Sequence, residues 1–280
     1  MGGTLRLGTL SEYRRAENHA VRDEHEGTFK VSLDFPQETT VSIEALQRAT
    51  LHTSPVSLGT SANNIRTRTF SGRFTEGCVF SVDNVSVASR TDEKITLSGN
   101  VTVHSEGADA YVLCLSKDPK VGSIILDPEY NSVWSIKTGS ILDFANEMIK
   151  VLTPLLATGE YVSQESVGPF VAPGFQFPRS KRNQLQFCLV AEIWPVLYRE
   201  REIVLSSDIS ENVVREIYSC IDRSASIKPS HFIHEAEVRI IFRPSFIEPS
   251  TNRRFLSPMH LKPVLLPFDP FLDMIDVEYP

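Results

Sequence analysis

The stretch richest in chemically useful side chains runs from residue 231 to residue 240, late in the chain. Glu235, Glu237 and Arg239 occur there at every second position, with apolar residues between them. Alternate side chains of a β-strand point to the same face, so two carboxylates and a guanidinium would share one surface. If that surface lines a cleft, one carboxylate raises the pKa of the other, whereas Arg239 lowers it or holds an anionic ligand. A half-exposed strand with an internal ion pair is the alternative interpretation.

A second charged stretch lies near the N-terminus, between residues 13 and 27. Its basic residues Arg14 and Arg22 are suited to bind phosphate or carboxylate oxygens. Asp23 or Glu26 would orient a ligand hydroxyl, because loops on rigid sheets often carry binding residues. The alternative is a solvated loop whose charges neutralise one another.

Two further features suggest chemistry but are better explained by structure. His231 and His234 precede the acidic strand, but a loop entering a strand does not present such a pair on one face, and we predict no metal site. Cys114 lies in the apolar run 110–115, which is typical of a buried central strand, and no base is placed beside it. The sequence also lacks the glycine-rich phosphate loop, the dinucleotide fingerprint, the serine elbow and the zinc-protease helix.

The elements that would position these residues are mostly strands. Runs of β-branched and aromatic residues separated by turn residues predict strands at 4–10, 28–35, 79–87, 94–104, 110–115, 184–194, 195–205, 237–243 and 261–266. Helical spacing predicts helices at 140–156 and 210–223, and a short one from 11 to 17 with Ser11 as its N-cap. The expected fold is α+β, with a mainly antiparallel, strongly bent sheet and two or more packed helices.

Length and composition indicate an ordinary globular protein. The 280 residues favour a single domain spanning 1–280, with a long exposed connection at about 160–183. A net charge of −7 argues against a wholly basic nucleic-acid-binding surface, although 66–73 and 179–182 are locally positive. No apolar run has the roughly 18–20 residues of a membrane span, and the start lacks a secretory signal, so we expect a cytoplasmic protein without a membrane partner. The four cysteines form no CxxC pair and are expected to be reduced.

Four stretches resemble uncharacterised bacterial proteins related to domain-of-unknown-function family 2971. They occur in the family's order and span nearly the whole chain. They are the N-terminal pattern Leu5-Arg6-Leu7-Gly8-Thr9-Leu10-x-x-Tyr13-Arg14-x-x-Glu17 with Asp23-x-x-Glu26-Gly27, the strand Tyr111 to Ser116, the stretch Val196-Leu197-Tyr198, and Phe232-x-x-Glu235-x-Glu237-x-Arg239. The resemblance implies no settled activity, but some family members occur in bacterial defence or mobile-element neighbourhoods.

An arginine and a tyrosine near the first strand, together with a late Glu-x-Glu strand, are also loosely similar to ADP-ribosyltransferases. This similarity implies that Glu237 hydrogen-bonds the nicotinamide ribose of NAD and that Glu235 orients the acceptor. Arg6 or Arg14 would hold the phosphates, and Tyr13 would lie in the same pocket.

Two hypotheses therefore follow from the sequence. The first is an enzyme with ADP-ribosyltransferase-like or NAD glycohydrolase activity, which requires Tyr13 and Arg14 to converge with Glu235 and Glu237. The second is a non-catalytic recognition module that binds a protein or nucleic-acid partner through its charged loops, because strong catalytic signatures are lacking.

Overall fold

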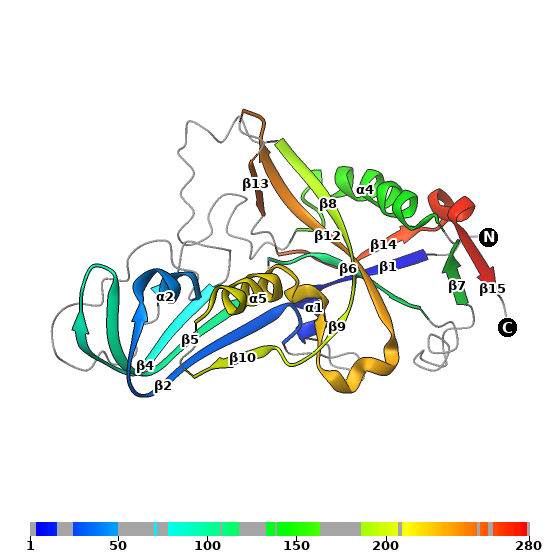
Figure 1. Ribbon diagram of the computed structural model, residues 1–280. Coiled ribbons are helices and arrows are strands. Elements are labelled where there is room, and N and C mark those ends of the chain that lie inside the picture. Colours follow the sequence, from blue (N-terminus) through cyan, green and yellow to red (C-terminus); the bar gives the residue numbers. More distant parts are fainter. Residues whose placement is uncertain are drawn as a thin grey trace.

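The computed structural model describes residues 4–15, 25–49, 70–71, 78–106, 108–117, 133–137, 139–162, 186–206, 209–250, 253–256 and 260–278. Helices and mostly antiparallel strands make up this part of the chain, which confirms the α+β prediction (Figure 1). The strands fall into two main sheets rather than one continuous bent sheet.

The first of these, which we call the central sheet, has six strands. Its order is β13-β12-β6-β1-β14, and β8 also pairs with β12. All of its pairs are antiparallel. The strands are β1 (Thr4–Thr9), β6 (Tyr111–Ser116), β8 (Gln186–Pro195), β12 (Glu237–Glu248), β13 (Arg253–Leu256) and β14 (Val264–Pro267).

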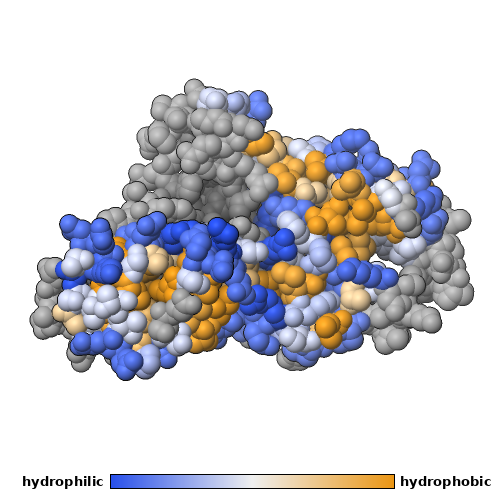
Figure 2. Space-filling view, in the orientation of Figure 1, coloured by the Kyte–Doolittle hydropathy of each residue, from blue (hydrophilic) through white to orange (hydrophobic). Residues whose placement is uncertain are grey.

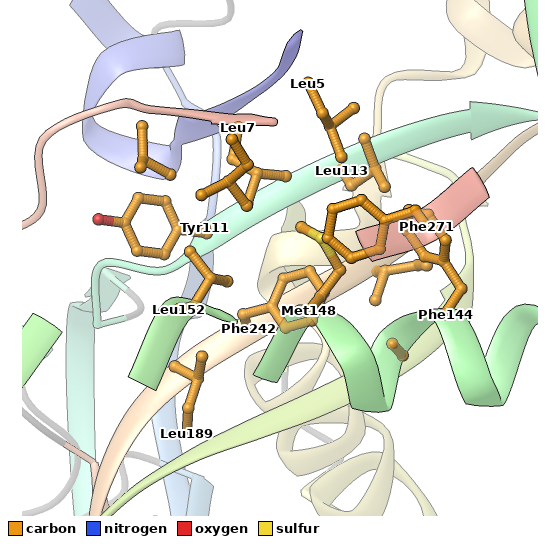
Figure 3. Close-up of a cluster of buried hydrophobic side chains, with 14 of the residues drawn as sticks. Leu5, Leu7, Tyr111, Leu113, Phe144, Met148, Leu152, Leu189, Phe242 and Phe271 are labelled. Atoms are coloured by element: carbon orange, nitrogen blue, oxygen red, sulfur yellow. The ribbon is translucent and has the colours of Figure 1, made fainter. Parts of the chain in front are cut away.

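Helix α4 (Ile141–Ala157) covers one face of the central sheet. Its apolar stripe, which includes Phe144 and Met148, meets alternate side chains of the strands, among them Leu7, Leu113 and Phe242 (Figure 3). These side chains are buried, because each strand turns every second residue toward the helix. The opposite face of the same sheet carries the charged residues described below.

The second sheet is the five-stranded outer sheet, with the order β10-β2-β5-β4-β3. Only the β10 and β2 pair is parallel among those described in this sheet. Helices α2 (Ile43–Ala49) and α5 (Glu211–Asp222) pack on it and enclose a separate hydrophobic core. Its strands are β2 (Thr28–Ser42), β3 (Phe70–Ser71), β4 (Cys78–Arg90), β5 (Lys94–Glu106) and β10 (Glu202–Leu205).

Shorter elements complete the described structure. Helix α1 (Leu10–Arg15) follows β1 directly. Two small sheets pair β7 (Val133–Ile136) with β15 (Ile275–Glu278), and β9 (Leu197–Tyr198) with β11 (Ile227–Lys228). The 3-10 helices are η2 (Ser224–Ser226), η3 (Ser230–Glu235) and η4 (Asp269–Met274).

The first helix is capped differently from the prediction. The Thr9 hydroxyl accepts the backbone N–H of Glu12 at 3.1 Å, so Thr9 rather than Ser11 is the capping residue. Ser11 instead donates its hydroxyl and backbone N–H to the buried Asp109 carboxylate, at 2.7 and 3.0 Å. Helix α2 was not predicted, because its short apolar stripe directly continues a long strand.

Several expectations fall on residues outside the described ranges. They are the basic residues of the stretches 66–73 and 179–182, and nearly all of the connection at 160–183, of which residues 160–162 are described. None of the helices in the described ranges combines the length and the apolarity that crossing a membrane would require.

Candidate functional site

The face of the central sheet turned away from α4 is polar along the start of β12. Glu237 and Arg239 lie on this face and are 5% and 2% exposed, so both charges are removed from water. The strand register places Cys114 of β6 on one side of Arg239 and Trp194 of β8 on the other. Directly paired residues point to the same face, so the three side chains form a row across the sheet.

Six charged residues meet at this face and are called the junction cluster: Glu26, Arg201, Lys228, Glu235, Glu237 and Arg239. Arg239 lies at its centre. The Arg239 guanidinium donates to both oxygens of Glu26 in a two-pronged pair, and its Nε donates to Glu237 Oε1 at 2.6 Å. It also donates to the backbone carbonyl of Ala225. Such a pair needs the planar guanidinium, which a lysine cannot replace.

Lys228 extends the cluster toward Glu235. Its ammonium lies 2.8 Å from Glu237 Oε2 and pairs with the Glu235 carboxylate as well. The ammonium also lies 5.1 Å from the ring centroid of Phe232, within the range of a cation–π contact. Arg201 approaches Glu26 Oε2 at 3.7 Å and donates to the carbonyl of Ile227. The three carboxylates are thus matched by three cations.

The junction cluster joins the two sheets. Glu26 precedes β2 of the outer sheet, and Ala225 follows α5, which packs on that sheet. Arg239 and Glu237 belong to the central sheet. Figure 2 shows that the visible surface between the two most hydrophobic areas is largely hydrophilic, apart from a smaller hydrophobic area in the middle. Ligand sites occur preferentially at such junctions.

A break in the backbone pattern brings Glu235 to the cluster. Glu235 ends the 3-10 helix η3, and Ala236 has a left-handed conformation with φ 45° and ψ 45° before β12 begins. The Tyr198 hydroxyl then accepts the backbone N–H of Glu237 at 2.7 Å, and the Glu237 carbonyl accepts the N–H of Val196 at 3.0 Å. The expected alternation therefore holds for Glu237 and Arg239, whereas Glu235 reaches the site from a helical turn.

Helix α1 places Tyr13 on the same polar face of the central sheet. A side chain at Gly8 would come within 3.0 Å of the Tyr13 ring, so the absence of a Cβ at Gly8 lets the ring lie against β1. The Tyr13 hydroxyl hydrogen-bonds with the Cys114 thiol, which in turn hydrogen-bonds with Glu237. A chain of polar contacts thus links α1, β6 and β12.

The two neighbouring glutamates have opposite pKa shifts. Burial would raise the pKa of Glu237, but the charges of Arg239 and Lys228 outweigh it and lower the pKa to about 2. Burial raises the pKa of Glu235, and the hydrogen bond and charge of Glu237 add to this effect, while Lys228 opposes it. At neutral pH Glu237 is therefore ionised, and Glu235 holds a proton more readily than an ordinary glutamate does.

Cys114 is an exposed residue, although protein atoms surround its thiol. Burial among protein atoms and the charge of Glu237 raise its pKa, and Cys114 together with burial raises the pKa of Tyr13. Cys114 therefore lies beside Glu237 and is reached by solvent. Its thiol stays protonated at neutral pH, so Cys114 is not an activated nucleophile. The expectation that Cys114 is a core residue was wrong, because its side chain points to the polar face.

Of the residues predicted for a site, Tyr13, Glu26, Glu235, Glu237 and Arg239 come together. Burial lowers the pKa of Arg14, and the charges of Asp109 and Glu26 oppose this effect, so the Arg14 guanidinium lies in the field of both carboxylates. Arg6 shares the sheet face of Gly8, but its exposed side chain pairs with Glu12. Arg22 and Asp23 lie outside the described residues.

The sequence reasoning missed Lys228, Arg201 and the Trp194 side chain. Lys228 and Trp194 have no charged neighbour that would mark them, and they become part of the site through strand pairing: β9 with β11 for Lys228, and β8 with β12 for Trp194. Arg201 lies in the charged run 199–202, and its sequence position does not indicate a contact with Glu26. The resemblance had pointed to the stretch Val196-Leu197-Tyr198, and Tyr198 does contact the site, because its hydroxyl accepts the backbone N–H of Glu237. Within the described residues, no group of three or more His, Cys, Asp or Glu side chains could hold a metal ion. His231 and His234 are both exposed.

Comparison of the chain with family models, with curated proteins and with solved structures found no match. The chemistry of the site is therefore argued from its geometry.

Proposed function

We propose that the junction cluster is the active site of an enzyme that cleaves the N-glycosidic bond of NAD and passes ADP-ribose to water or another acceptor. The observation that carries this proposal is the Glu235 and Glu237 pair, whose pKa values are shifted in opposite directions by a shared environment. Two carboxylates with separated pKa values are the arrangement that acid–base chemistry at a glycosidic bond uses.

In the proposed reaction, the bond between the ribose C1′ and the nicotinamide nitrogen breaks, and its electron pair stays on nicotinamide, which leaves uncharged. The ribose then carries positive oxocarbenium character, which the ionised Glu237 stabilises. Water attacks C1′, and its proton passes to Glu235 as general base. The raised pKa of Glu235 makes it a stronger base than an ordinary glutamate.

The remaining residues would orient these two carboxylates and the substrate. Arg239, which is itself paired with Glu26, holds Glu237 in place, and all three residues are buried. Tyr13 and Cys114 would flank the ribose, because both lie near Glu237 and Cys114 is exposed. Arg14 and Arg6, on the Tyr13 side of the site, are the candidate phosphate ligands.

The test is release of nicotinamide from NAD, followed by chromatography, with wild type and the variants Glu235→Gln and Glu237→Gln. Each variant is expected to lose at least about a hundredfold in rate, since each removes a carboxylate that acts on the reacting atoms. Glu147→Gln is the matched control, because Glu147 pairs with Lys150 on the surface of α4. Equal rates in all four proteins, or no release by wild type, would contradict the proposal.

A recognition module is the second candidate, and one observation favours it. Both oxygens of Glu237 are already bound, by Arg239 and Lys228, as in a cluster that only fastens two sheets together. On this proposal the partner, a protein or a nucleic acid, binds the exposed loops. For a nucleic acid, affinity would fall steeply with added salt. The relation to family 2971, a bacterial defence role and a cytoplasmic location are likewise proposals.

A further inference from the structure

A stacked arginine and tryptophan lie at one edge of the junction cluster. Trp194 is half-buried on β8, directly across from Arg239. Arg223 follows α5, and its guanidinium lies over the indole ring of Trp194, 4.2 Å from the ring centroid. Trp194 also packs on the small apolar cluster that includes Ala225 and Ile241.

Arg223 differs from the cations of the junction cluster. Arg201, Lys228 and Arg239 each face a carboxylate, whereas within the described residues Arg223 makes no ion pair, and its contact is with the indole. An arginine on an aromatic ring keeps its N–H donors, which lie in the guanidinium plane, available to an anion. The Arg223 side chain is half-exposed, so an anion can reach it.

We infer that Trp194 and Arg223 form a subsite for a nucleoside monophosphate group. The base stacks on the indole in place of the guanidinium, and the released guanidinium binds the phosphate. Stacking requires an aromatic base, and the Arg223 guanidinium favours a negative charge, so a nucleotide satisfies both requirements, whereas a sugar phosphate or a free nucleoside satisfies only one.

This inference rests on the proposed function in one respect: the adenylate half of NAD would occupy the subsite. Trp194 and Cys114 are separated by the single strand β12, which corresponds to roughly 10 Å across two strand spacings. The nicotinamide ribose would then lie near Cys114 and Tyr13, beside the two glutamates.

Tryptophan fluorescence can report binding at Trp194, because the chain has only two tryptophans. Trp134 stacks on Phe144 in the core under α4, so Trp134→Phe keeps an aromatic ring there and leaves Trp194 as the single tryptophan. Titration of this variant with AMP, followed by Trp194 fluorescence, should show saturable quenching. Adding Arg223→Gln should weaken the apparent affinity for AMP about fivefold or more, because the phosphate loses its charged partner. Adenosine and ribose 5-phosphate, each lacking one recognised group, should bind more weakly than AMP.

Two outcomes would overturn the subsite: no quenching by AMP at millimolar concentration, or quenching that Arg223→Gln leaves unchanged. The nicotinamide assay separates this inference from the proposed function. Quenching by AMP without NAD cleavage would support the subsite and contradict the enzyme proposal. NAD cleavage without quenching by AMP would support the enzyme proposal and contradict the subsite. Circular dichroism of the Trp134→Phe protein with and without Arg223→Gln checks that both are folded.

Discussion

Arg239 is the residue on which the junction cluster depends. Its side chain is 2% exposed and holds two buried carboxylates and a carbonyl, so removing it leaves Glu26 and Glu237 without their main compensating charge. Breaking a buried ion pair from one side costs far more than the pair contributes, because the remaining charge stays desolvated.

We therefore predict that Arg239→Met lowers the free energy of unfolding by about 3–5 kcal/mol. Arg48→Met is the matched control, because Arg48 makes a two-pronged pair with Glu211 on the surface, where water screens the charges. Urea denaturation of both variants measures the difference. If the two substitutions cost the same, Arg239 is not the centre of a desolvated network.

The lowered pKa of Glu237 predicts a pH dependence of stability with a definite sign. The carboxyl is lowered from 4.5 to about 2 on folding, so its contribution is complete above pH 4.5 and is lost as the pH falls toward 2. The contribution is on the order of 3 kcal/mol at neutral pH. The difference in unfolding free energy between wild type and Glu237→Gln should therefore be larger at pH 7 than at pH 3. A difference that is the same at both values would show that Glu237 is not ion-paired in the folded protein.

At the scale of elements, β1 and α1 act as one unit that places Tyr13. The ring lies over Gly8, and a Cβ there would meet three of its atoms at 3.0 Å. We predict that Gly8→Ala destabilises the fold by about 1–3 kcal/mol, because the ring has to move away from Cys114. In a Tyr13→Ala background the same substitution should cost much less, since the obstructing ring is gone. Thermal unfolding of the four proteins of this cycle gives the coupling, and additive effects would refute the contact.

The elements also show where sequence reasoning succeeds and where it stops. Alternation predicted that Glu237 and Arg239 share a face, because β12 is regular over those positions. It failed for Glu235, since the left-handed Ala236 separates a 3-10 turn from the strand. The long helices were predicted nearly to their ends by their apolar spacing. The partners Lys228 and Arg201 could not be predicted, because only tertiary pairing brings them beside a carboxylate.

At the scale of the whole molecule, the chain builds two cores and places its buried charges between them. The outer sheet contributes Glu26, Arg201 and Lys228 with its attached segments, and the central sheet contributes Glu237 and Arg239. Neither sheet alone contains the cluster, so the proposed site exists only when both are assembled. This arrangement explains why the acidic strand and the N-terminal loop, more than 200 residues apart, carry partners of one ion pair.

The most direct test of the central claim is the pH dependence of nicotinamide release from NAD by wild type and by Glu235→Gln. We predict that the wild-type rate rises with pH as Glu235 loses its proton, through an apparent pKa above the ordinary value of 4.5, and that this rise is absent from the slow residual rate of the variant. A Glu235→Gln protein with the wild-type rate and the wild-type pH profile would contradict the claim that the junction cluster is an active site.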